Sequence, residues 1–495
     1  VFGERLFPGY SVQETLLFKV TRDADFSVDE NRDDDFIEAM EELLEDRRAS
    51  MPVKLVCNSG SSVIQEVITS RLGLSAEDVC RIDGTIDLAT LSDIANIEGY
   101  PHLKNPPWRH IYPPELPQEI PLWDEIKRTD VMLHLPYQSY EPVLHFINEA
   151  ADDHSVLAIK MTLYRTSGDS PLVHALERAA RNGKQVTAFV ELKARFDEKQ
   201  NISWADRLEK AGVIVVYGIA RLKVHAKMLL VVRREPEGIR RYVHLSTGNY
   251  NDKTAKLYSD ISLFTSNQEI ANDATLFFNM ISGYSAIQPM KRLFMAPINL
   301  KSQLLEMIER EMLRSTQDTP GLIMAKMNSL ADPDIIEALY RASSASVRVM
   351  LNVRGICMLV PGVKGQSENI TVVSIIGRYL EHSRIFYFQN GGAEEIYLSS
   401  ADWMPRNLDR RVELMFPVLQ ETLRQKIQEI LRLYFSDNTR SHYLQSSGEW
   451  RARSPEGDEP PVQAQQILYG WEKTAADSKS GETPREFVVR RDDIR

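Results

Sequence analysis

The strongest constraint on the fold of this chain is an internal repeat, in which two series of alternating strands and helices can be aligned. The first series starts near residue 150 and the second near residue 321. VTAFVELK (186–193) matches VRVMLNVR (347–354), and KMT (160–162) matches KMN (326–328). Alternation of strands and helices is typical of layered α/β folds, and repetition of a whole series indicates related domains. We therefore expect an α/β protein with two tandem domains.

Each series carries the same kinds of polar residue in the same order. A histidine is followed two residues later by a cation, then by a serine-rich turn ending in Asn or Asp, and finally by a carboxylate. The matched pairs, first series then second, are His225 and His382, Lys227 and Arg384, Asn249 and Asp402, Lys253 and Arg406, and Asp260 and Glu413. Accidental agreement between two homologous cores would have to produce these roles twice in order. We interpret the pairs as parts of one functional site.

The first histidine lies in RLKVHAKMLLVV (221–232), an apolar run that predicts a buried strand. Side chains alternate along a strand, so His225 and Lys227 would point to the same face. Burying a lysine is costly unless a partner or an anionic ligand compensates its charge. An edge strand with a solvated lysine is the alternative that this stretch alone leaves open.

Two histidines together with two cations predict phosphoryl or phosphodiester transfer. One neutral imidazole can attack phosphorus and form a phosphohistidine, and the other can protonate the leaving oxygen. Lys227 and Arg384 would neutralise the phosphoryl oxygens, and Asn249 would add an uncharged donor. A carboxylate commonly holds the second nitrogen of a nucleophilic imidazole. Asp260 and Glu413 stand at suitable repeat positions for this role, with surface carboxylates on strands as the alternative.

Further cations are expected at the carboxyl ends of strands, where ligands bind in α/β sheets. Arg165 ends one strand, Lys193 and Arg195 end another, and Arg354 ends the counterpart in the second series. Together they favour a polyphosphate channel. GNYNDKT (248–254) lacks the second glycine of a phosphate-binding loop, and the sequence has neither an HExxH motif nor a kinase catalytic loop. ATP, if used, would be bound without a P-loop.

The remaining features narrow the class of protein. A length of 495 residues predicts about three domains, and three widely spaced cysteines argue against disulfides or a zinc site. The net charge of −11 disfavours a general nucleic-acid binder, so a polyanion site must be a local basic cluster. No apolar run reaches membrane-spanning length, and we find no signal-peptide pattern.

The two ends of the chain lack the alternating strand and helix pattern of the repeat. Near the N-terminus we expect a helix around Phe36–Leu44, a strand at 53–57, a helix at 61–73 and a proline-rich linker at 105–117. The last twenty or so residues have the composition of a polar, mobile tail. None of these segments predicts a chemistry.

Paired H-x-K motifs, each followed by a polar turn, resemble the phospholipase D superfamily. A more specific resemblance, over essentially the whole chain except its tail, is to bacterial polyphosphate kinases. It rests on motifs in the right order: LFPGYSV, RLKVHAKMLLVVRRE, YVHLSTGNYNDKTAKLYSDISLFT, NVRGICMLVPGVKGQSENI, GRYLEHSRIFYF and YLSSADWMPRNLDRRVE. Arg384 in place of a second H-x-K lysine is usual in that family. The resemblance implies reversible transfer of the γ-phosphate of ATP to polyphosphate through a phosphohistidine.

The resemblance also implies roles for individual residues. His225 would be the phosphorylated nucleophile and His382 the second catalytic histidine. Arg165 and Arg195 match positions associated with Mg²⁺, and because a guanidinium has no lone pair for a metal, they would hold the phosphates that carry the ion. The expected ATP-contacting residues are Tyr258, Arg354 and His382. The expected phosphate-binding residues are Lys193, Lys253, Arg406 and Arg411.

The implied architecture is two tandem phospholipase-D-like α/β domains preceded by part of an α+β head domain. The predicted boundaries are 1–111 for the partial head domain, 112–292 and 293–475 for the catalytic domains, and 476–495 for the tail. The family's N-terminal domain, with a nucleotide-contacting Asn, lies outside this sequence. Expected ligands are ATP, ADP and inorganic polyphosphate, with Mg²⁺ as cofactor and no specific nucleic acid. We expect a cytoplasmic homo-oligomer, dimer or tetramer, with at most peripheral attachment to the inner membrane face.

Two other functions remain open from the sequence. A phospholipase-D-like phosphodiesterase or nuclease would use the same histidines with water as the acceptor. A polyanion-binding scaffold would have no catalysis, although both motif copies keep their histidine. Tyr258 and the strand-end arginines favour the kinase, because hydrolysis of a diester needs no nucleotide clamp.

Overall fold

The computed structural model describes residue 5 and residues 8–23, 50–117, 120–166, 169–192, 198–218, 222–283, 285–316 and 318–480. It divides into two compact units, Val1–Trp108 and Arg109–Arg495. The division falls inside the proline-rich segment that we expected to be a linker. The helix expected around Phe36–Leu44 lies outside the described residues, as do the cations Lys193 and Arg195.

The first unit contains a small three-stranded sheet with β2 in the centre, antiparallel to β1 and parallel to β3. Its strands and helices are β1 (Phe18–Arg22), β2 (Pro52–Cys57), α3 (Ser62–Leu72), β3 (Val79–Arg81) and α4 (Leu91–Ala95). Helix α3 begins at the N-cap Ser61, whose hydroxyl accepts a hydrogen bond from a backbone N–H of the first turn. The strand and the helix expected here are confirmed.

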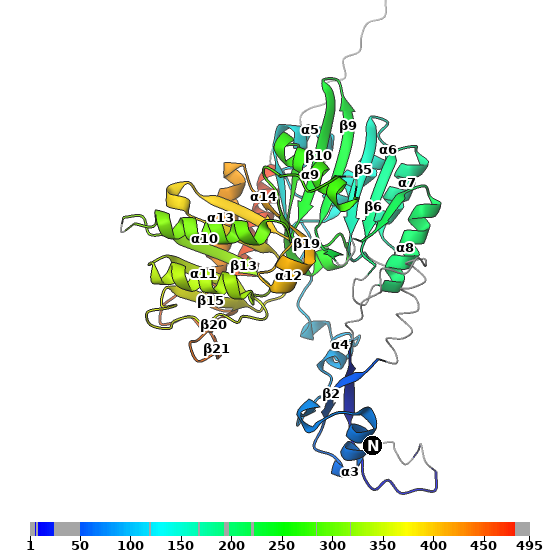
Figure 1. Ribbon diagram of the computed structural model, residues 1–495, viewed down its shortest axis with the longest axis vertical. Coiled ribbons are helices and arrows are strands. Elements are labelled where there is room, and N and C mark those ends of the chain that lie inside the picture. Colours follow the sequence, from blue (N-terminus) through cyan, green and yellow to red (C-terminus); the bar gives the residue numbers. More distant parts are fainter. Residues whose placement is uncertain are drawn as a thin grey trace, which may run out of the picture. The chain divides into compact units, whose positions relative to one another are not determined.

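The first series of the second unit forms a sheet in the order β16-β11-β10-β9-β5-β6-β7, with β4 also paired to β11. Figure 1 labels its central strands β10, β9, β5 and β6. Strands β5, β6 and β7 are parallel, whereas β9, β10, β11 and β4 pair antiparallel. The elements are α5 (Leu122–Arg128), β4 (Val131–Leu135), α6 (Glu141–Asp152), β5 (Val156–Leu163), α7 (Pro171–Arg181), β6 (Gln185–Val190), α8 (Glu198–Lys210), β7 (Ile214–Tyr217), β9 (Met228–Glu235), β10 (Gly238–Ser246), β11 (Tyr258–Thr265) and α9 (Gln268–Ile281).

The second series repeats this plan in a sheet of order β12-β19-β18-β17-β13-β14-β15-β20-β21, with β8 also paired to β19. Its elements are β12 (Phe294–Ala296), α10 (Leu300–Arg314), β13 (Leu322–Met327), α11 (Pro333–Ser344), β14 (Arg348–Val353), β15 (Ile370–Ile375), β17 (Arg384–Phe388), β18 (Glu395–Ser399), α12 (Pro405–Arg410), β19 (Arg411–Pro417), α13 (Glu421–Ser436), β20 (Ser441–Leu444), β21 (Trp450–Ala452) and α14 (Ala464–Ser480). The α/β fold class is confirmed. Helix α14 extends past the predicted start of the tail, because the buried Ala464 and Leu468 anchor it.

Each series donates a two-residue strand to the sheet of the other. Strand β8 (Lys223–Val224) of the first series pairs with β19, and β16 (Leu380–Glu381) of the second pairs with β11. These strands come directly before His225 and His382. The prediction of one unbroken strand over 221–232 is therefore wrong, because the chain leaves one sheet after β8 and enters the other only at β9.

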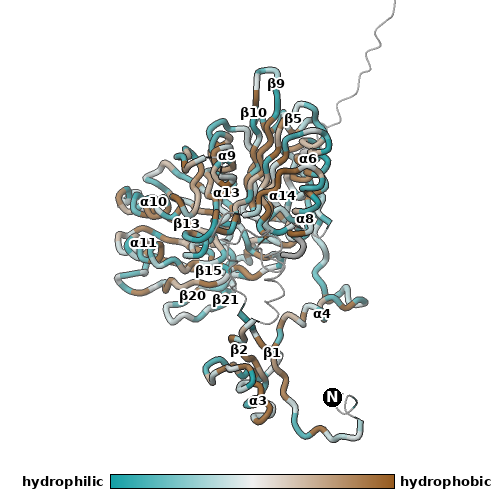
Figure 2. The backbone as a smooth tube through the Cα atoms, turned by 45° about the vertical axis from the view of Figure 1, so that its right-hand side comes forward, coloured by the Kyte–Doolittle hydropathy of each residue, from teal (hydrophilic) through white to brown (hydrophobic). Residues whose placement is uncertain are grey.

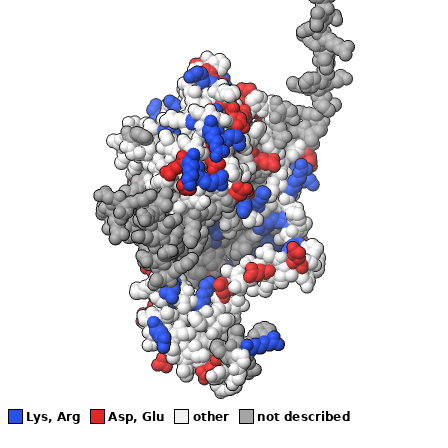
Figure 3. Space-filling model, turned by 90° about the vertical axis from the view of Figure 1, so that its right-hand side faces the viewer, with Lys and Arg blue, Asp and Glu red and all other residues white. Residues whose placement is uncertain are grey.

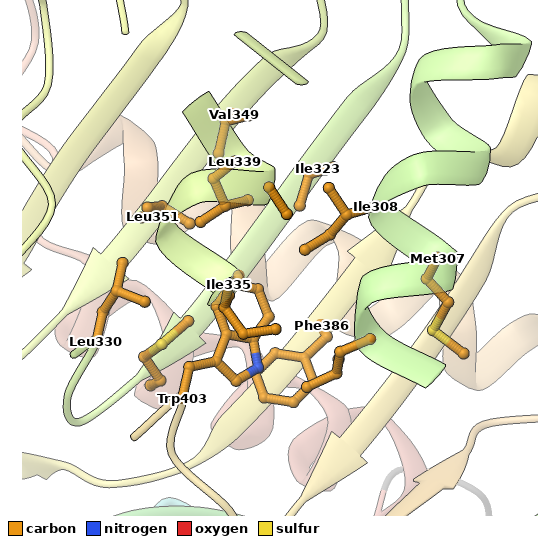
Figure 4. Close-up of a cluster of buried hydrophobic side chains, with 14 of the residues drawn as sticks. Met307, Ile308, Ile323, Leu330, Ile335, Leu339, Val349, Leu351, Phe386 and Trp403 are labelled. Atoms are coloured by element: carbon orange, nitrogen blue, oxygen red, sulfur yellow. The ribbon is translucent and has the colours of Figure 1, made fainter. Parts of the chain in front are cut away.

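The core of the second series shows how the layers are built. Ile323 and Ala325 of β13 pack with Leu339 of α11 in a large buried cluster, which also includes residues of α10 (Figure 4). Lys326 points the other way, with its ammonium 5.2 Å from the ring centre of Tyr434 in α13. Because side chains alternate along a strand, α10 and α11 cover one face of the sheet and α13 covers the opposite face.

Hydropathy follows the same layering. Hydrophobic residues concentrate in central strands such as β5 and β9, and hydrophilic residues in many connecting turns (Figure 2). Within the part of the chain that the structure describes, no helix combines the length and the apolar character needed to cross a membrane.

Candidate active site

His225 lies where the chain crosses from one sheet to the other. Its backbone N–H and that of Ala226 both donate to the carbonyl of Val412 in β19, at 2.9 and 3.0 Å. Thr162, near the end of β5, holds the residues that follow His225. Its hydroxyl donates to Ala226 O at 2.7 Å and accepts from Met228 N–H at 3.0 Å. The loop between β8 and β9 is thereby fixed by both series.

The imidazole of His225 is held by a carboxylate of the second series. Its Nδ1 lies 2.8 and 2.9 Å from the oxygens of Glu413, and Ser400 Oγ donates to this carboxylate at 2.5 Å. Burial raises the pKa of Glu413 to about 7. Burial, together with Lys227 and Arg411, holds the pKa of His225 well below its usual range, so the ring is neutral. Ionised Glu413 can only accept, which places the proton on Nδ1 and the lone pair on Nε2.

His382 repeats this arrangement with the two series exchanged. The N–H groups of His382 and Ser383 donate to Ser259 O in β11, at 3.1 and 2.7 Å. Nδ1 lies 2.9 Å from both oxygens of Asp260. Burial acts to raise the pKa of Asp260, but His382 and a hydrogen bond from Thr247 hold it below its usual value. The sequence indicated both carboxylates, and the structure pairs each with the histidine of the opposite series.

Both repeat cations are buried, which excludes the solvated alternative for Lys227. This side chain belongs to a residue only 2% exposed, its ammonium donates to His225 O, and it lies 5.4 Å from the ring centre of Tyr164. Burial lowers the pKa of Lys227 well below its usual value. Arg384 forms two hydrogen bonds to Asp402, at 3.0 and 3.2 Å. Asp402, which the repeat matched to Asn249, therefore orients the guanidinium of Arg384.

The residues matched to ATP contacts gather around His382. The ring centres of Tyr258 and His382 are 5.3 Å apart. Arg354 Nε donates to Asn328 Oδ1 at 3.0 Å, and Asn328 Nδ2 donates to His382 O at 3.2 Å. Asn249 Oδ1 is buried and has no hydrogen-bond partner among the described residues. An amide oxygen only accepts, so the Nδ2 group of Asn249 is the one that could donate to a phosphate oxygen.

Two of the expected phosphate-binding arginines lie close to His225. Arg411 in β19 places Nη1 3.9 Å from Glu413. The guanidinium of Arg165 is 5.6 Å from the ring centre of Tyr164, which in turn lies 4.6 Å from that of His225. Tyr164 therefore bridges the strand-end cation and the histidine.

The other expected cations are placed differently. Lys253 and Arg406 are exposed, at the start of equivalent helical turns. On the face drawn in Figure 3, the basic and acidic side chains of the described residues are interspersed. The cations nearest the histidines are instead Lys227 and Arg384, which are almost fully buried.

Sequence reasoning missed several residues that shape the site, namely Thr162, Tyr164, Gly248 and Ser400. A methyl group at Gly248 would overlap the carboxylate of Asp260, so this glycine allows the turn to approach that strand closely. The alignment of KMT with KMN was a signal for Thr162, and the STGN turn was one for Gly248. The serine-rich turn that ends in Asp402 was a signal for Ser400, whereas Tyr164 carried none.

The described residues do not offer a protein-bound metal site. No group of three His, Cys, Asp or Glu side chains able to hold an ion occurs among them. Arg165, which we matched to a magnesium position, has no lone pair to give a metal. These residues fit phosphate groups instead.

Comparisons with known proteins agree with this geometry. Family models match three successive segments: the polyphosphate kinase middle domain at 1–94, C-terminal domain 1 at 121–287 and C-terminal domain 2 at 293–465. A polyphosphate kinase from Halalkalibacterium halodurans is 45% identical over 483 residues, which cover 97% of this chain and 68% of that protein. The chain belongs to the polyphosphate kinase family.

Other members of this family give the same result. The Rhodopirellula baltica enzyme is 46% identical over 469 residues, covering 94% of this chain and 55% of its own length. The Synechocystis enzyme is 49% identical, covering 94% and 66%. A crystal structure of polyphosphate kinase from Porphyromonas gingivalis matches with a TM-score of 0.82 at 36% identity, covering 96% of this chain and 69% of that one. The chain thus spans about half to two thirds of these relatives, and the family inferred from motifs is confirmed.

Proposed function

We propose that the protein is an ATP:polyphosphate phosphotransferase, which reversibly moves the γ-phosphate of ATP to the end of inorganic polyphosphate. The observation that carries this proposal is the buried pair of His225 and Glu413, which presents Nε2 of a neutral imidazole as a nucleophile. Family membership supports the same activity. Because the chain spans only part of its relatives, the activity of this chain itself belongs to the proposal.

In the proposed reaction, the Nε2 lone pair of His225 attacks the γ-phosphorus of ATP. A P–N bond forms while the bond from phosphorus to the bridging oxygen breaks, and ADP leaves with the electron pair. A terminal oxygen of polyphosphate then attacks the phosphohistidine, the P–N bond breaks, and the chain is one unit longer. Glu413 stabilises the positive charge that develops on the ring during attack.

His382 is proposed as the second catalytic histidine, which protonates the leaving oxygen. Burial lowers its pKa, and Asp260 opposes this effect only in part, so the ring is neutral without substrate. Bound phosphates would bring negative charge close to the ring and raise its pKa. Substrate binding would therefore allow His382 to take up the proton that it donates to the departing ADP.

The surrounding residues are proposed to bind the two substrates. Lys227 and Arg384 would neutralise the transferred phosphoryl oxygens in a site that excludes water. Asn249 would contribute its amide, and Tyr258 and Arg354 would hold the nucleotide. The residues proposed to bind polyphosphate are Lys193, Lys253, Arg406 and Arg411. Mg²⁺ would arrive bound to nucleotide phosphates, and Arg165 and Arg195 would grip those phosphates.

We also propose the wider organisation expected from the sequence. A partial head domain (1–111), two catalytic domains (112–292 and 293–475) and a tail (476–495) are supported by the family segments and by the division after Trp108. A cytoplasmic homo-oligomer with at most peripheral membrane attachment is supported only by the family resemblance. The phosphodiesterase alternative is not favoured by the comparisons, whose curated relatives are named polyphosphate kinases.

Labelling tests the proposal directly. The protein would be incubated with Mg²⁺ and ATP carrying a radioactive γ-phosphate, and the protein-bound label tested in acid and alkali. We expect label that is labile in acid and stable in alkali, absent from His225→Ala and discharged onto polyphosphate. Equal label in wild type and His225→Ala would refute the nucleophile. No label, together with cleavage of a phosphodiester, would instead support the hydrolase.

A further inference from the structure

A buried ion pair lies directly behind His382, among groups to which no role has been given. Lys326 of β13 and Glu381 of β16 have side chains 1% exposed each, and Lys326 Nζ lies 3.0 Å from Glu381 Oε2. Burial of two charges carries a desolvation cost that apolar side chains of similar volume would avoid. Stability alone is therefore a poor explanation for the pair, and its other contacts indicate its purpose.

Lys326 and Glu381 hold the chain on both sides of His382. Lys326 Nζ donates to Ser383 Oγ at 2.8 Å, so it binds both sequence neighbours of the histidine. Glu381 in turn accepts from Ser259 Oγ at 2.6 Å. Ser259 is also the residue whose carbonyl receives the N–H groups of His382 and Ser383. These bonds fix the backbone while leaving the imidazole of His382 directed to its own carboxylate.

Gln465 of α14 holds the same strand from its outer edge. Its Oε1 accepts from Tyr379 N–H at 3.0 Å, and its Nε2 donates to Tyr379 O at 2.9 Å and to Glu381 Oε1 at 2.7 Å. Strand β16 ends its sheet, and the side-chain amide pairs with it as a peptide group of another strand would. Gly377 makes room for this contact, since a methyl group there would overlap the Gln465 amide.

The first series has a different arrangement at the matching positions. Lys160 is the counterpart of Lys326, and it reaches Asn279 Oδ1 at 3.4 Å. The counterpart of Glu381 is Val224, which cannot form an ion pair. The chain around the first histidine is held instead by the Thr162 hydroxyl and by the buried Glu191, whose carboxylate accepts from Val224 N–H at 2.7 Å. Among the matched positions, the Lys–Glu ion pair occurs only beside the second histidine.

We propose that Lys326, Glu381 and Gln465 are positioning residues, which hold His382 against Asp260 for phosphoryl transfer. This inference rests on the proposed function of the site. The three side chains act through the backbone of 379–383, and Gln465 gives helix α14 a part in positioning His382. Their removal should displace His382 and leave His225 with its carboxylate in place.

The test uses Gln465→Met, which keeps the length of the side chain and removes its amide. Gln466→Met is the matched control, because Gln466 is exposed on the same helix. The kcat and the KM for ATP would be measured with polyphosphate as acceptor. Proton NMR of the ligand-free protein would follow the two downfield Nδ1–H resonances of the histidine–carboxylate pairs, assigned with His225→Gln and His382→Gln.

We expect Gln465→Met to lower kcat about 10- to 100-fold, with a smaller change in KM, since a small displacement of a catalytic group costs about that much. The His382 resonance should shift or broaden, the His225 resonance should stay, and Gln466→Met should match wild type. Wild-type kcat, or a lower kcat with an unchanged His382 resonance, would overturn the proposal.

A second variant keeps the test decisive if the first folds poorly. Lys326→Met combined with Glu381→Met removes both charges together and leaves neither one buried alone. The same selective change in the His382 resonance is expected. An unchanged resonance would again count against a positioning role of Lys326 and Glu381. If the wild-type protein forms no phosphohistidine, the proposed function fails, whereas the NMR comparison still decides the positioning role.

Discussion

Replacing Glu413 by Gln tests the proposed mechanism most severely. The substitution keeps the shape of a side chain that is 0% exposed, and it removes the charge that holds His225 Nδ1 at 2.8 Å. A Gln amide can donate a hydrogen bond to Nδ1, which moves the ring proton to Nε2 and occupies the lone pair needed for attack. Ser400 Oγ can still donate to the remaining carbonyl oxygen.

The size of the effect follows from known orienting carboxylates. Loss of such a carboxylate with the geometry kept lowers turnover about 10⁴-fold through the wrong tautomer, which corresponds to about 5 kcal/mol of activation free energy. We therefore expect phosphohistidine formation to slow by about 10³- to 10⁴-fold in Glu413→Gln. ATP binding should change little, because Glu413 is buried behind the histidine.

The pH dependence gives a second signature. Burial raises the pKa of Glu413 to about 7, so below that pH the carboxyl is protonated and no longer fixes the reactive tautomer of His225. The wild-type rate should fall as pH drops through about 7, and Glu413→Gln should lack this fall. Stability changes in the opposite sense, because the folded state holds a proton that the unfolded state releases near pH 4.5. As the pH rises from about 4.5 to about 7, the free energy of unfolding of the wild type should therefore fall by about 3 kcal/mol relative to that of Glu413→Gln.

Rapid-quench labelling with radioactive ATP, below and above the pKa of Glu413, would measure the rate. Glu311→Gln is the control, since Glu311 is also 0% exposed and accepts from Leu322 N–H and Asn390 N–H at 3.0 and 2.8 Å. Glu311→Gln should label at the wild-type rate. Label forming in Glu413→Gln within tenfold of the wild-type rate, or the same fall at acid pH, would refute the reasoning.

Three further predictions use the same chain. Gly248→Ala should abolish most activity while the protein stays folded, because the new methyl group pushes Asp260 away from His382; circular dichroism and kcat together check this. Leu339→Ala should lower the free energy of unfolding by about 2–5 kcal/mol, since it opens a cavity in a fully buried core; urea titration measures it. Thr162→Val should cost about 1–3 kcal/mol and slow labelling, because buried backbone groups of the nucleophile loop lose their partner.

Local signals in the sequence were enough to predict the fold class and the main residues of the candidate site. The repeat predicted two α/β series, and local pattern predicted the strand at 53–57 and the helix at 61–73, where β2 and α3 lie. The paired order of histidine, cation and carboxylate predicted that His225, His382, Asp260 and Glu413 belong to one site, and the structure brings each histidine to a carboxylate of this set. Such predictions succeed because side-chain periodicity and residue chemistry are local properties that a single sequence displays.

The pairing across the site depended on tertiary structure. Both histidines interact with the carboxylate of the other series, because β8 and β16 each join the opposite sheet, and no periodicity in the sequence reports which sheet a two-residue strand joins. Because of this crossing, the strand expected around His225 is interrupted. Long-range packing also brings Gln465, 83 residues after His382, beside β16, the strand that directly precedes His382. The sequence by itself determined which groups are present and in what order. Only long-range packing decided which of them meet, since those contacts join residues far apart along the chain.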